Sequence, residues 1–321
     1  MKASLRRICI LLAAPIVLVF AAAFILWIYT LFLQWGLDER LPPPGRMVNI
    51  GTHALHIDCR GEGAPTVVLE AGASSWSTHW ERVQTLMSEQ TRVCSYDRAG
   101  LGWSEAGPTP RDPEVLAREL DRLLRAAGES PPFVLIGTSY GGNIAWQFAQ
   151  IFPQQTAGLV TVETPDIEFM AWRRSLRFIP SDTHIRIFRP LLTILMAASE
   201  VLFRRDMDQF PWQHFSSQAK IVMSDVAFRS RMKPGLLRER NDPENMGEMR
   251  PLQNDIPLVV VQGVNSQFGS PEWDAAQQRL LSQANRGQLF RAEDGTHIVH
   301  MERPEVIVEA LRYILRTDTP E

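Results

Sequence analysis

The stretch that most constrains this chain is Gly-Thr-Ser-Tyr-Gly-Gly, at residues 137–142. Residues 133–136 before it form an apolar run typical of a buried strand, and residues 143–149 after it are typical of a helix. A Gly-x-Ser-x-Gly sequence between a strand and a helix is a nucleophile elbow, a turn that lifts the serine hydroxyl clear of the sheet. Because the turn is tight, the positions two residues either side of the serine accept only very small residues. The motif therefore predicts that Ser139 is a nucleophile, and the alternative is a plain glycine-rich turn.

Strands and helices alternate over most of the chain. Residues 65–69 are an apolar, β-branched run of the kind found inside parallel sheets. The clearest helix begins after Asp112, an N-cap residue that Pro113 follows, and it closes at Gly128. Strands that alternate with helices predict a mostly parallel sheet with helices on both faces. The other predicted strands are residues 47–49, 53–59, 92–96, 133–136, 158–162, 257–261 and 288–291.

This alternation breaks in the segment of residues 165–251. The segment has no clear strand, and its helical stretches lie at 169–178, 191–203, 215–228 and near 238–249. We therefore predict a helical cap inserted into the α/β core. The core then consists of a first part, residues 42–164, and a second part, residues 252–321.

A long apolar run lies near the N-terminus. Lys2, Arg6 and Arg7 precede residues 8–33, which contain no charged side chain. A helix needs about 20 apolar residues to cross a bilayer, whereas the core of a cleaved signal peptide has only about 7–15. We predict a retained signal anchor that holds residues 8–33 in the lipid bilayer, with a cleaved leader as the alternative. The positive-inside rule then puts the N-terminus in the cytoplasm and the catalytic part on the non-cytoplasmic side. Residues 1–41 would form the cytoplasmic stub, the anchor and the start of a linker.

The net charge and the spacing of the cysteines argue against several kinds of binding site. The net charge is −3 and no long basic block occurs, which argues against a nucleic-acid partner. Cys9, Cys59 and Cys94 do not have the spacing of a metal site or a disulfide framework. Cys59 and Cys94 lie in predicted strands, where we expect buried free thiols, with a disulfide as the alternative. The adjacent charges Asp97 and Arg98 are interpreted as a structural salt bridge that braces the glycine turn after them.

A serine of ordinary pKa is a poor nucleophile, so it needs a base, which in turn needs an acid to orient it. His297 is the predicted base. It follows the last predicted strand directly after a glycine turn, where its ring can reach over the edge of the sheet. His300 lies three residues further on, and we expect it to be a packing neighbour or a substrate contact rather than the base.

The negatively charged oxygen that forms during acyl transfer needs backbone N–H donors. The amide of Tyr140 is one candidate, because it lies at the N-terminus of the helix that follows the elbow. The second donor is expected in the loop after the first parallel strand, where small residues let the backbone approach the substrate. We predict the Ala73 amide for this role, with Ser74 as the alternative.

Three motifs occur in a fixed order along the chain. They are Tyr-Asp-Arg-Ala-Gly-Leu-Gly-Trp-Ser at residues 96–104, the elbow at 137–142, and Gly-Thr-His at 295–297. With these motifs the chain resembles the α/β-hydrolase superfamily with an inserted lid, over about residues 46–316. The resemblance implies an eight-stranded sheet, a Ser–His–acid triad and no cofactor. Ser139 at the elbow argues against dehalogenase or epoxide hydrolase chemistry, which needs a carboxylate nucleophile.

The acid of the triad departs from the usual pattern of these hydrolases. The acid usually follows the strand before the last one, but residues 262–267 hold no carboxylate. The neighbouring strand does end in an acid, Glu163, and some dehalogenase-like members place their acid there. We predict Glu163 as the triad acid, and the alternatives are Asp166, Glu272 and Asp274.

Together these features predict a membrane-anchored serine hydrolase that cleaves carboxylic esters or related acyl compounds. The anchor and the cap favour an apolar small-molecule substrate, although the fold does not fix its identity. Two alternatives stay open. One is an acyltransferase of the same fold, in which an alcohol replaces water. The other is a catalytically silent hydrolase fold that serves as a membrane-tethered binding module.

Overall fold

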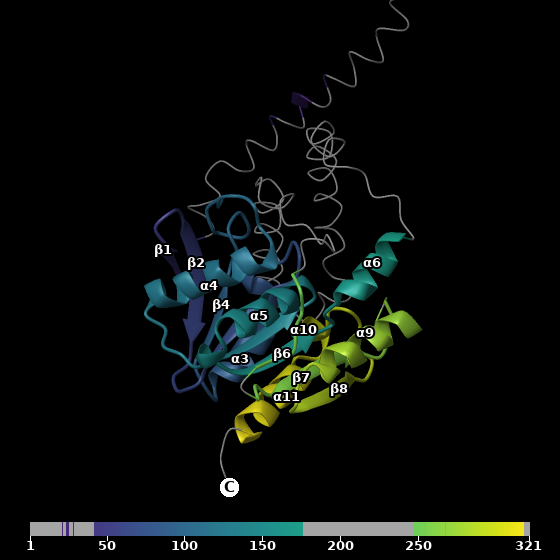
Figure 1. Cartoon of the computed structure of the whole chain (residues 1–321). Coiled ribbons are helices and arrows are strands. Elements are labelled where there is room, and N and C mark those ends of the chain that lie inside the picture. Colours follow the sequence, from purple (N-terminus) through teal and green to yellow (C-terminus); the bar gives the residue numbers. More distant parts are fainter. Residues whose placement is uncertain are drawn as a thin grey trace, which may run out of the picture. The chain divides into compact units, whose positions relative to one another are not determined.

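The fold is seen in a computed structural model that describes residues 42–175, 247–253, 255–266 and 268–317, with residues 21, 24, 25 and 28. The described residues form an eight-stranded sheet with the order β1-β2-β4-β3-β5-β6-β7-β8 (Figure 1). The pairs β1–β2 and β2–β4 are antiparallel, and all the other neighbours are parallel. The predicted eight-stranded, mostly parallel sheet is confirmed. Its strands are β1 (Arg46–Asn49), β2 (Ala54–Arg60), β3 (Thr66–Glu70), β4 (Val93–Tyr96), β5 (Phe133–Thr138), β6 (Thr156–Val162), β7 (Leu258–Gly263) and β8 (Gly287–Ala292).

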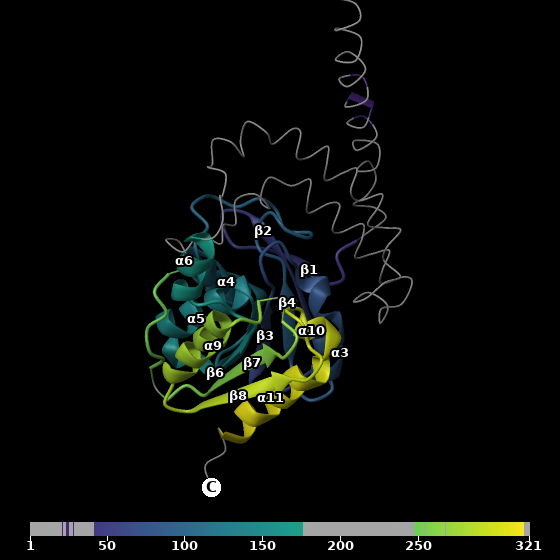
Figure 2. The same ribbon diagram turned by 90° about the vertical axis from the view of Figure 1, so that its right-hand side faces the viewer.

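Helices cover both faces of this sheet, as predicted (Figure 2). One hydrophobic cluster joins helices α4, α5 and α9 to one face, which includes Val68 and Leu135. A second cluster joins α3 and α11 to the other face, which includes Val67 and Val134. The described helices are α3 (Glu81–Ser88), α4 (Pro113–Ala127), α5 (Tyr140–Ile151), α6 (Ile167–Ser175), α9 (Pro271–Ser282), α10 (Val299–Glu302) and α11 (Pro304–Thr317), with short 3-10 turns η1 (Ser77–Trp80) and η2 (Pro153–Gln155).

Helix α4 has the ends that its sequence predicts. The Asp112 side chain accepts a hydrogen bond from the Val115 N–H at 3.0 Å, and Pro113 stands in the first turn. Gly128 ends the helix in the left-handed conformation, with φ 78°. Because glycine adopts this conformation without a steric penalty, it is a favoured C-cap.

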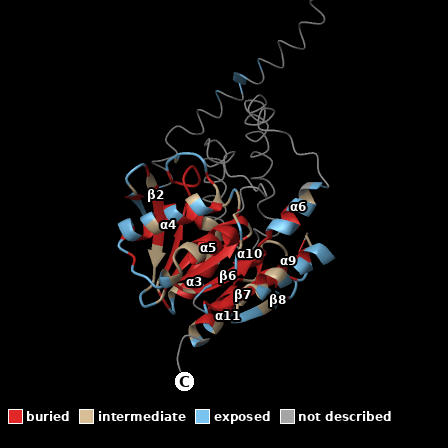
Figure 3. Ribbon diagram, viewed as in Figure 1, coloured by how far each residue is buried: buried red, intermediate tan, exposed pale blue. Residues whose placement is uncertain are grey.

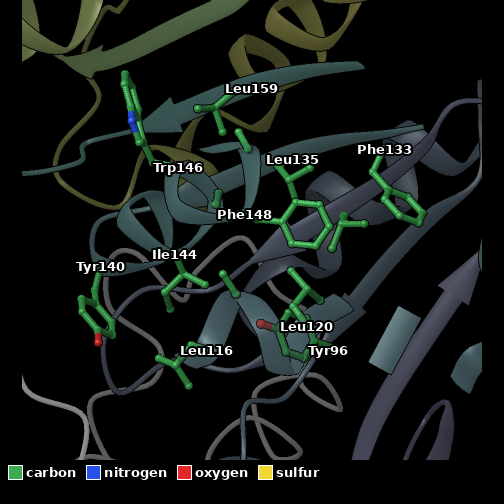
Figure 4. Packing of buried hydrophobic residues seen from close by; sticks show 14 of the residues in the cluster. Tyr96, Leu116, Leu120, Phe133, Leu135, Tyr140, Ile144, Trp146, Phe148 and Leu159 are labelled. Carbon is green, nitrogen blue, oxygen red and sulfur yellow. The ribbon is translucent and has the colours of Figure 1, made fainter. Parts of the chain in front are cut away.

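The central parallel strands are buried on both faces, so their sequences are continuous apolar runs instead of alternating ones (Figure 3). Every residue of β3 and of β5 is buried. Around β5, the rings of Phe133 and Phe148 pack edge to face, with their centroids 6.2 Å apart (Figure 4). This packing holds α5 against the strand that precedes it, and so fixes the elbow between the two.

The predicted cap and the predicted anchor fall mostly outside the described residues. The chain divides into two units, and the sheet with its helices belongs to the unit of Pro43–Ile179 and Lys233–Glu321. Helix α6 begins where the first cap helix is expected, but the stretches at 191–203 and 215–228, and nearly all of 238–249, lie outside the described residues. Most of residues 8–33, the predicted anchor, also lie outside the described residues. Among the described residues, no helix is long and apolar enough to cross a membrane. The predicted domain boundaries therefore stay predictions.

The prediction for two of the cysteines is wrong. Cys59 and Cys94 form a disulfide, whereas we expected free thiols. The two residues lie directly opposite each other in the antiparallel pair of β2 and β4, with a Cα–Cα distance of 4.0 Å. The sequence places each cysteine in a strand, but it does not say that β2 pairs with β4 or in which register. That register decides whether two thiols can meet.

Candidate active site

Ser139 stands at a strained turn between β5 and α5. Its backbone has φ 51° and ψ −125°, a conformation that costs a residue other than glycine about 1–3 kcal/mol. The turn also brings two stretches of backbone into contact. A Cβ on Gly137 would lie 2.4 Å from the Gly141 carbonyl oxygen, and one on Gly141 would lie 2.4 Å from the Ala71 oxygen. These contacts explain the glycines two residues either side of the serine, and they are the geometry of a nucleophile elbow.

His297 lies on the loop that follows β8, next to the N-terminus of α10. Its side chain is 18% exposed, and its ring packs edge to face against Phe268, with the centroids 4.6 Å apart. The Nδ1 atom is 3.1 Å from Oε2 of Glu163, so one ring nitrogen faces a carboxylate. With Nδ1 facing the carboxylate, Nε2 is the ring nitrogen left for proton transfer.

Glu163 comes directly after β6, in the left-handed region with φ 49°. Its side chain is fully buried, and its oxygens accept several hydrogen bonds. Oε1 accepts from the Gly263 N–H at 2.8 Å, and Oε2 accepts from the Ser266 hydroxyl while it faces His297. The structure therefore brings together Glu163 and His297, which are 134 positions apart in the sequence.

Ser139 and His297 line one cavity of about 290 Å³. Gly72 and Ala73, from the loop after β3, form part of its wall next to the serine. Tyr140 is the first residue of α5, where backbone N–H groups point out of the helix end. Ala73 thus lines the same cavity as Ser139, and Tyr140 follows the serine directly in the chain; their roles as oxyanion donors stay predictions. Apolar side chains supply much of the remaining wall, namely Pro165, Phe169, Met170, Phe268, Trp273 and Ile298.

Comparison with known proteins settles the family. The family model described as "Alpha/beta hydrolase family" matches residues 55–310, which is more than half of the chain. The chain belongs to the alpha/beta hydrolase family. Its sequence is 39% identical over 104 residues to an AB hydrolase superfamily protein of Gibberella zeae, a match that covers 31% of this hydrolase and 32% of that relative.

Two solved structures of hydrolases share the fold. A thermophilic esterase from Thermogutta terrifontis superposes with a TM-score of 0.58 at 23% identity, covering 85% of this hydrolase and 99% of the esterase. An epoxide hydrolase named CorEH superposes with a TM-score of 0.63 at 21% identity, covering 85% and 98% of the two chains. The likeness to an esterase and to an epoxide hydrolase establishes the fold, which different hydrolytic reactions use.

The other candidate acids of the chain are placed differently. Asp166 accepts from the Phe169 N–H at 2.8 Å and pairs with Arg279, so it caps α6. Asp274 accepts from the Gln262 side chain, and Glu272 is exposed in the first turn of α9.

The loop of residues 262–267, which lacks the expected acid, has a different role. It contributes the Gly263 N–H and the Ser266 hydroxyl, two donors to the Glu163 carboxylate. From the sequence, this loop was described only as lacking a carboxylate, and Ser266 was not considered as a donor. The signal was present in the sequence, because a hydrogen-bond donor at this place is what a carboxylate arriving from the neighbouring strand requires.

The interpretation of Asp97 and Arg98 as a salt bridge with each other is corrected by the structure. Asp97 faces His56 at 3.0 Å and accepts from the N–H groups of Ser77 and Trp103, so it does brace the glycine turn. Burial raises the pKa of Asp97, but the hydrogen bond and charge of His56, with the two backbone N–H groups, outweigh burial and hold the pKa below its ordinary value. Arg98 turns the other way and pairs with Glu70, at the end of β3.

His300 also lines the cavity, but it is not placed like a base. Its side chain is buried against Trp80, with the ring centroids 4.7 Å apart, and neither ring nitrogen has a hydrogen-bond partner among the residues that the structure describes. Burial lowers the pKa of His300 well below its ordinary value, and the nearby His79 and His297 lower it further. Burial likewise lowers the pKa of His79, to about 4, against the opposing effects of the Trp76 backbone and Asp97.

The lowered pKa values of His79 and His300 predict that the free energy of unfolding decreases in mild acid. Below pH about 6.5 the unfolded chain binds a proton at each of them, whereas the folded protein does not until the pH is much lower. Stability is therefore fully present above pH 6.5 and falls as the pH drops toward 4, by about 1.4 kcal/mol per pH unit for each histidine. Urea unfolding at pH 7.5 and at pH 5 should show that His300→Phe loses less stability on acidification than the wild type. An equal loss in the two proteins would contradict this origin.

Proposed function

We propose that this hydrolase cleaves carboxylic esters or related acyl compounds through a covalent acyl-enzyme on Ser139. The observation that carries the proposal is the 3.1 Å contact between His297 Nδ1 and the buried Glu163 carboxylate, at a cavity that Ser139 also lines. A histidine held in this way by a carboxylate is the arrangement that activates a serine in acyl transfer. The same contact supports an active enzyme over a catalytically silent fold, because it gives His297 a carboxylate partner although residues 262–267 hold none.

Each residue then has one task in the reaction. Ser139 Oγ attacks the acyl carbon while His297 takes its proton, and Glu163 stabilises the imidazolium that forms. The N–H groups of Tyr140 and Ala73 hold the oxyanion of the tetrahedral intermediate. His297 next gives the proton to the leaving alcohol, and a water molecule releases the acyl group by the same steps in reverse order.

The cavity favours a substrate with an apolar part next to the scissile bond. Phe169, Met170 and Phe268 line it, and burying apolar groups against such side chains is favourable by roughly 25 cal/mol per Å². An epoxide substrate does not fit this proposal, because its opening in this fold needs a carboxylate at the position of Ser139. An acyltransferase would share every step up to the acyl-enzyme and differ only in the acceptor alcohol.

We further propose that the catalytic part lies on the non-cytoplasmic side of a membrane, held there by residues 8–33. Two features support this location. The apolar run follows basic residues, and the positive-inside rule orients such a run with its N-terminus in the cytoplasm. The Cys59–Cys94 disulfide in the sheet is typical of proteins in oxidising compartments outside the cytoplasm.

A fluorophosphonate probe tests both parts of the proposal. Such probes phosphonylate an activated serine, and we expect mass spectrometry of the full-length protein to place the label on Ser139. A probe that cannot cross membranes should label the protein in membrane vesicles whose non-cytoplasmic face is turned outward, and it should label it in oppositely oriented vesicles only after detergent is added. Folded protein that takes no label would contradict the serine mechanism. The reverse pattern in the two kinds of vesicle would contradict the location, and product analysis with added alcohols would reveal an acyltransferase.

A further inference from the structure

We propose that Arg98 is a positioning residue, one that orients and polarises the peptide group of the oxyanion donor Ala73. This inference rests on the proposed function, because it concerns the donors of the same acyl transfer. From the sequence, Arg98 was expected to have a purely structural role, in a salt bridge with Asp97. Its contacts in the structure lead instead to the loop that holds Gly72 and Ala73.

The guanidinium group of Arg98 reaches the end of β3 with two nitrogens. Nη2 donates to the Gly72 carbonyl oxygen at 2.7 Å. Nη1 donates to the Ala71 carbonyl oxygen at 2.5 Å and to the Glu70 carboxylate at 2.7 Å. A planar guanidinium carries its donors in a rigid fork, so these contacts fix consecutive peptide groups in one orientation.

The Gly72 carbonyl and the Ala73 N–H belong to one peptide group. This peptide bond is not among the three cis bonds of the described residues, so its C=O and N–H point in opposite directions. With the oxygen held by Arg98, and also by the Ser75 N–H at 3.2 Å, the Ala73 N–H points away from the guanidinium. A cation bound to the oxygen also draws charge from the peptide group and makes its N–H a stronger donor, by about 10–30% for each bond in such a chain.

The arginine is itself held in place within the core. The Arg98 side chain is 1% exposed and that of Glu70 is fully buried, so each charge compensates the other in a site without water contact. The Tyr96 hydroxyl donates to the other carboxylate oxygen of Glu70. Burial raises the pKa of Tyr96 well above its ordinary value, and the charge of Glu70 raises it further, so the tyrosine keeps the proton that it donates.

The peptide groups that Arg98 holds are in contact with the elbow. A Cβ on Gly141 would lie 2.4 Å from both the Glu70 and the Ala71 carbonyl oxygens. A Cβ on Gly72 would lie 3.4 Å from the Ser139 Cβ. The contacts with Gly141 come from the Glu70 and Ala71 oxygens, so we expect a rotation of the Gly72–Ala73 peptide to move the Ala73 N–H relative to the serine while those contacts stay in place.

The test compares two conservative substitutions. Arg98→Lys keeps the positive charge but loses the fork, since an ammonium group is a point charge. Arg111→Lys is the matched control, because Arg111 is equally buried and pairs with Glu119 at 2.8 Å, apart from the oxyanion loop. Glu70→Gln is a second test variant, since an amide can still accept from Arg98 and it preserves the shape of the site. Urea unfolding establishes that each variant is folded.

The measured quantities are kcat and KM for an ester and the Ki of a trifluoromethyl ketone. The ketone binds as a tetrahedral adduct, in which Ser139 Oγ bonds to its carbonyl carbon, the carbonyl oxygen becomes an oxyanion and His297 takes the proton. Removal of one oxyanion donor costs about 10²–10³ in kcat, so we expect a misaligned donor to cost about 10–100-fold. For Arg98→Lys we expect kcat to fall and Ki to rise by similar factors, with KM nearly unchanged, and for Glu70→Gln a smaller change in the same direction.

Two different results would overturn the inference, and only the second would also overturn the proposed function. Folded Arg98→Lys and Glu70→Gln proteins with the kcat and Ki of the Arg111→Lys control would show that Arg98 is merely structural, with the serine mechanism intact. A wild-type protein that neither hydrolyses esters nor binds the ketone would overturn the proposed function, and the role of Arg98 with it.

Discussion

Replacing Ser139 with alanine is expected to lower kcat for a short p-nitrophenyl ester by about 10⁶-fold. The expected loss is this large because the serine, the histidine and the acid act as a unit, so that without the nucleophile no acyl-enzyme forms. The activity that remains is what the oxyanion donors and substrate binding supply on their own. The measurement is a steady-state assay on purified full-length protein, with active-site titration to exclude traces of wild type.

The substitution should leave the fold unchanged or slightly stabilised. Ser139 adopts a strained backbone conformation, with φ 51°, and alanine meets the same strain there without needing to place a hydroxyl group. Ser88→Ala is a matched control, because this serine lies on α3 and bonds only to the Thr85 carbonyl within its own helix. A folded Ser139→Ala protein with more than about one hundredth of wild-type kcat would contradict the proposed nucleophile.

Local features of the fold could be predicted from the sequence because short-range physics determines them. The apolar run of β5 and the caps of α4 at Asp112 and Gly128 depend on neighbouring residues alone. The elbow is only partly local: a Cβ on Gly137 would meet the Gly141 carbonyl within the turn, whereas a Cβ on Gly141 would meet Ala71, at the end of the neighbouring strand β3. The order of strands and helices then follows from the alternation of these elements.

Pairings between distant segments were harder to predict, because they depend on which strands become neighbours. The sequence pointed to Glu163 as the acid through its place at the end of a strand, but whether Ser266 reaches that carboxylate depends on the pairing of β6 with β7, which the sequence does not state. The sequence likewise led to the wrong prediction of free thiols at Cys59 and Cys94. Their disulfide follows from the register of β2 with β4. In each case the missing information is the register between two strands, which no single stretch of sequence contains.

Replacing Glu163 with glutamine is expected to lower kcat by about 10³–10⁴-fold, with a smaller effect on KM. Both carboxylate oxygens accept hydrogen bonds, from Gly263 on one side and from Ser266 and His297 on the other. An amide has a single acceptor oxygen, so its NH₂ group must face a donor or hold His297 in the wrong tautomer. A steady-state assay measures kcat, and urea unfolding should show a cost of about 1–3 kcal/mol for the donor left unpaired.

Asp274→Asn is the control for this substitution, because Asp274 is a carboxylate of the same region whose partner is Gln262. We expect it to keep kcat within about threefold of wild type, since a residue outside the triad makes no bond that forms only in the transition state. If Asp274→Asn were as damaging as Glu163→Gln, the assignment of the acid would be wrong.

A stricter test of the role of Glu163 transfers the carboxylate from position 163 to position 266. Ser266 Oγ donates to Oε2 of Glu163, the oxygen that His297 Nδ1 also faces, so position 266 approaches the same point from the neighbouring strand. In a Glu163→Ala background, Ser266→Asp should therefore place a carboxylate within reach of the histidine. We expect the double variant to recover at least about tenfold in kcat over Glu163→Ala alone, because an acid at either strand end can orient the same imidazole. A folded double variant with no gain would mean that Glu163 acts by a route other than its contact with His297.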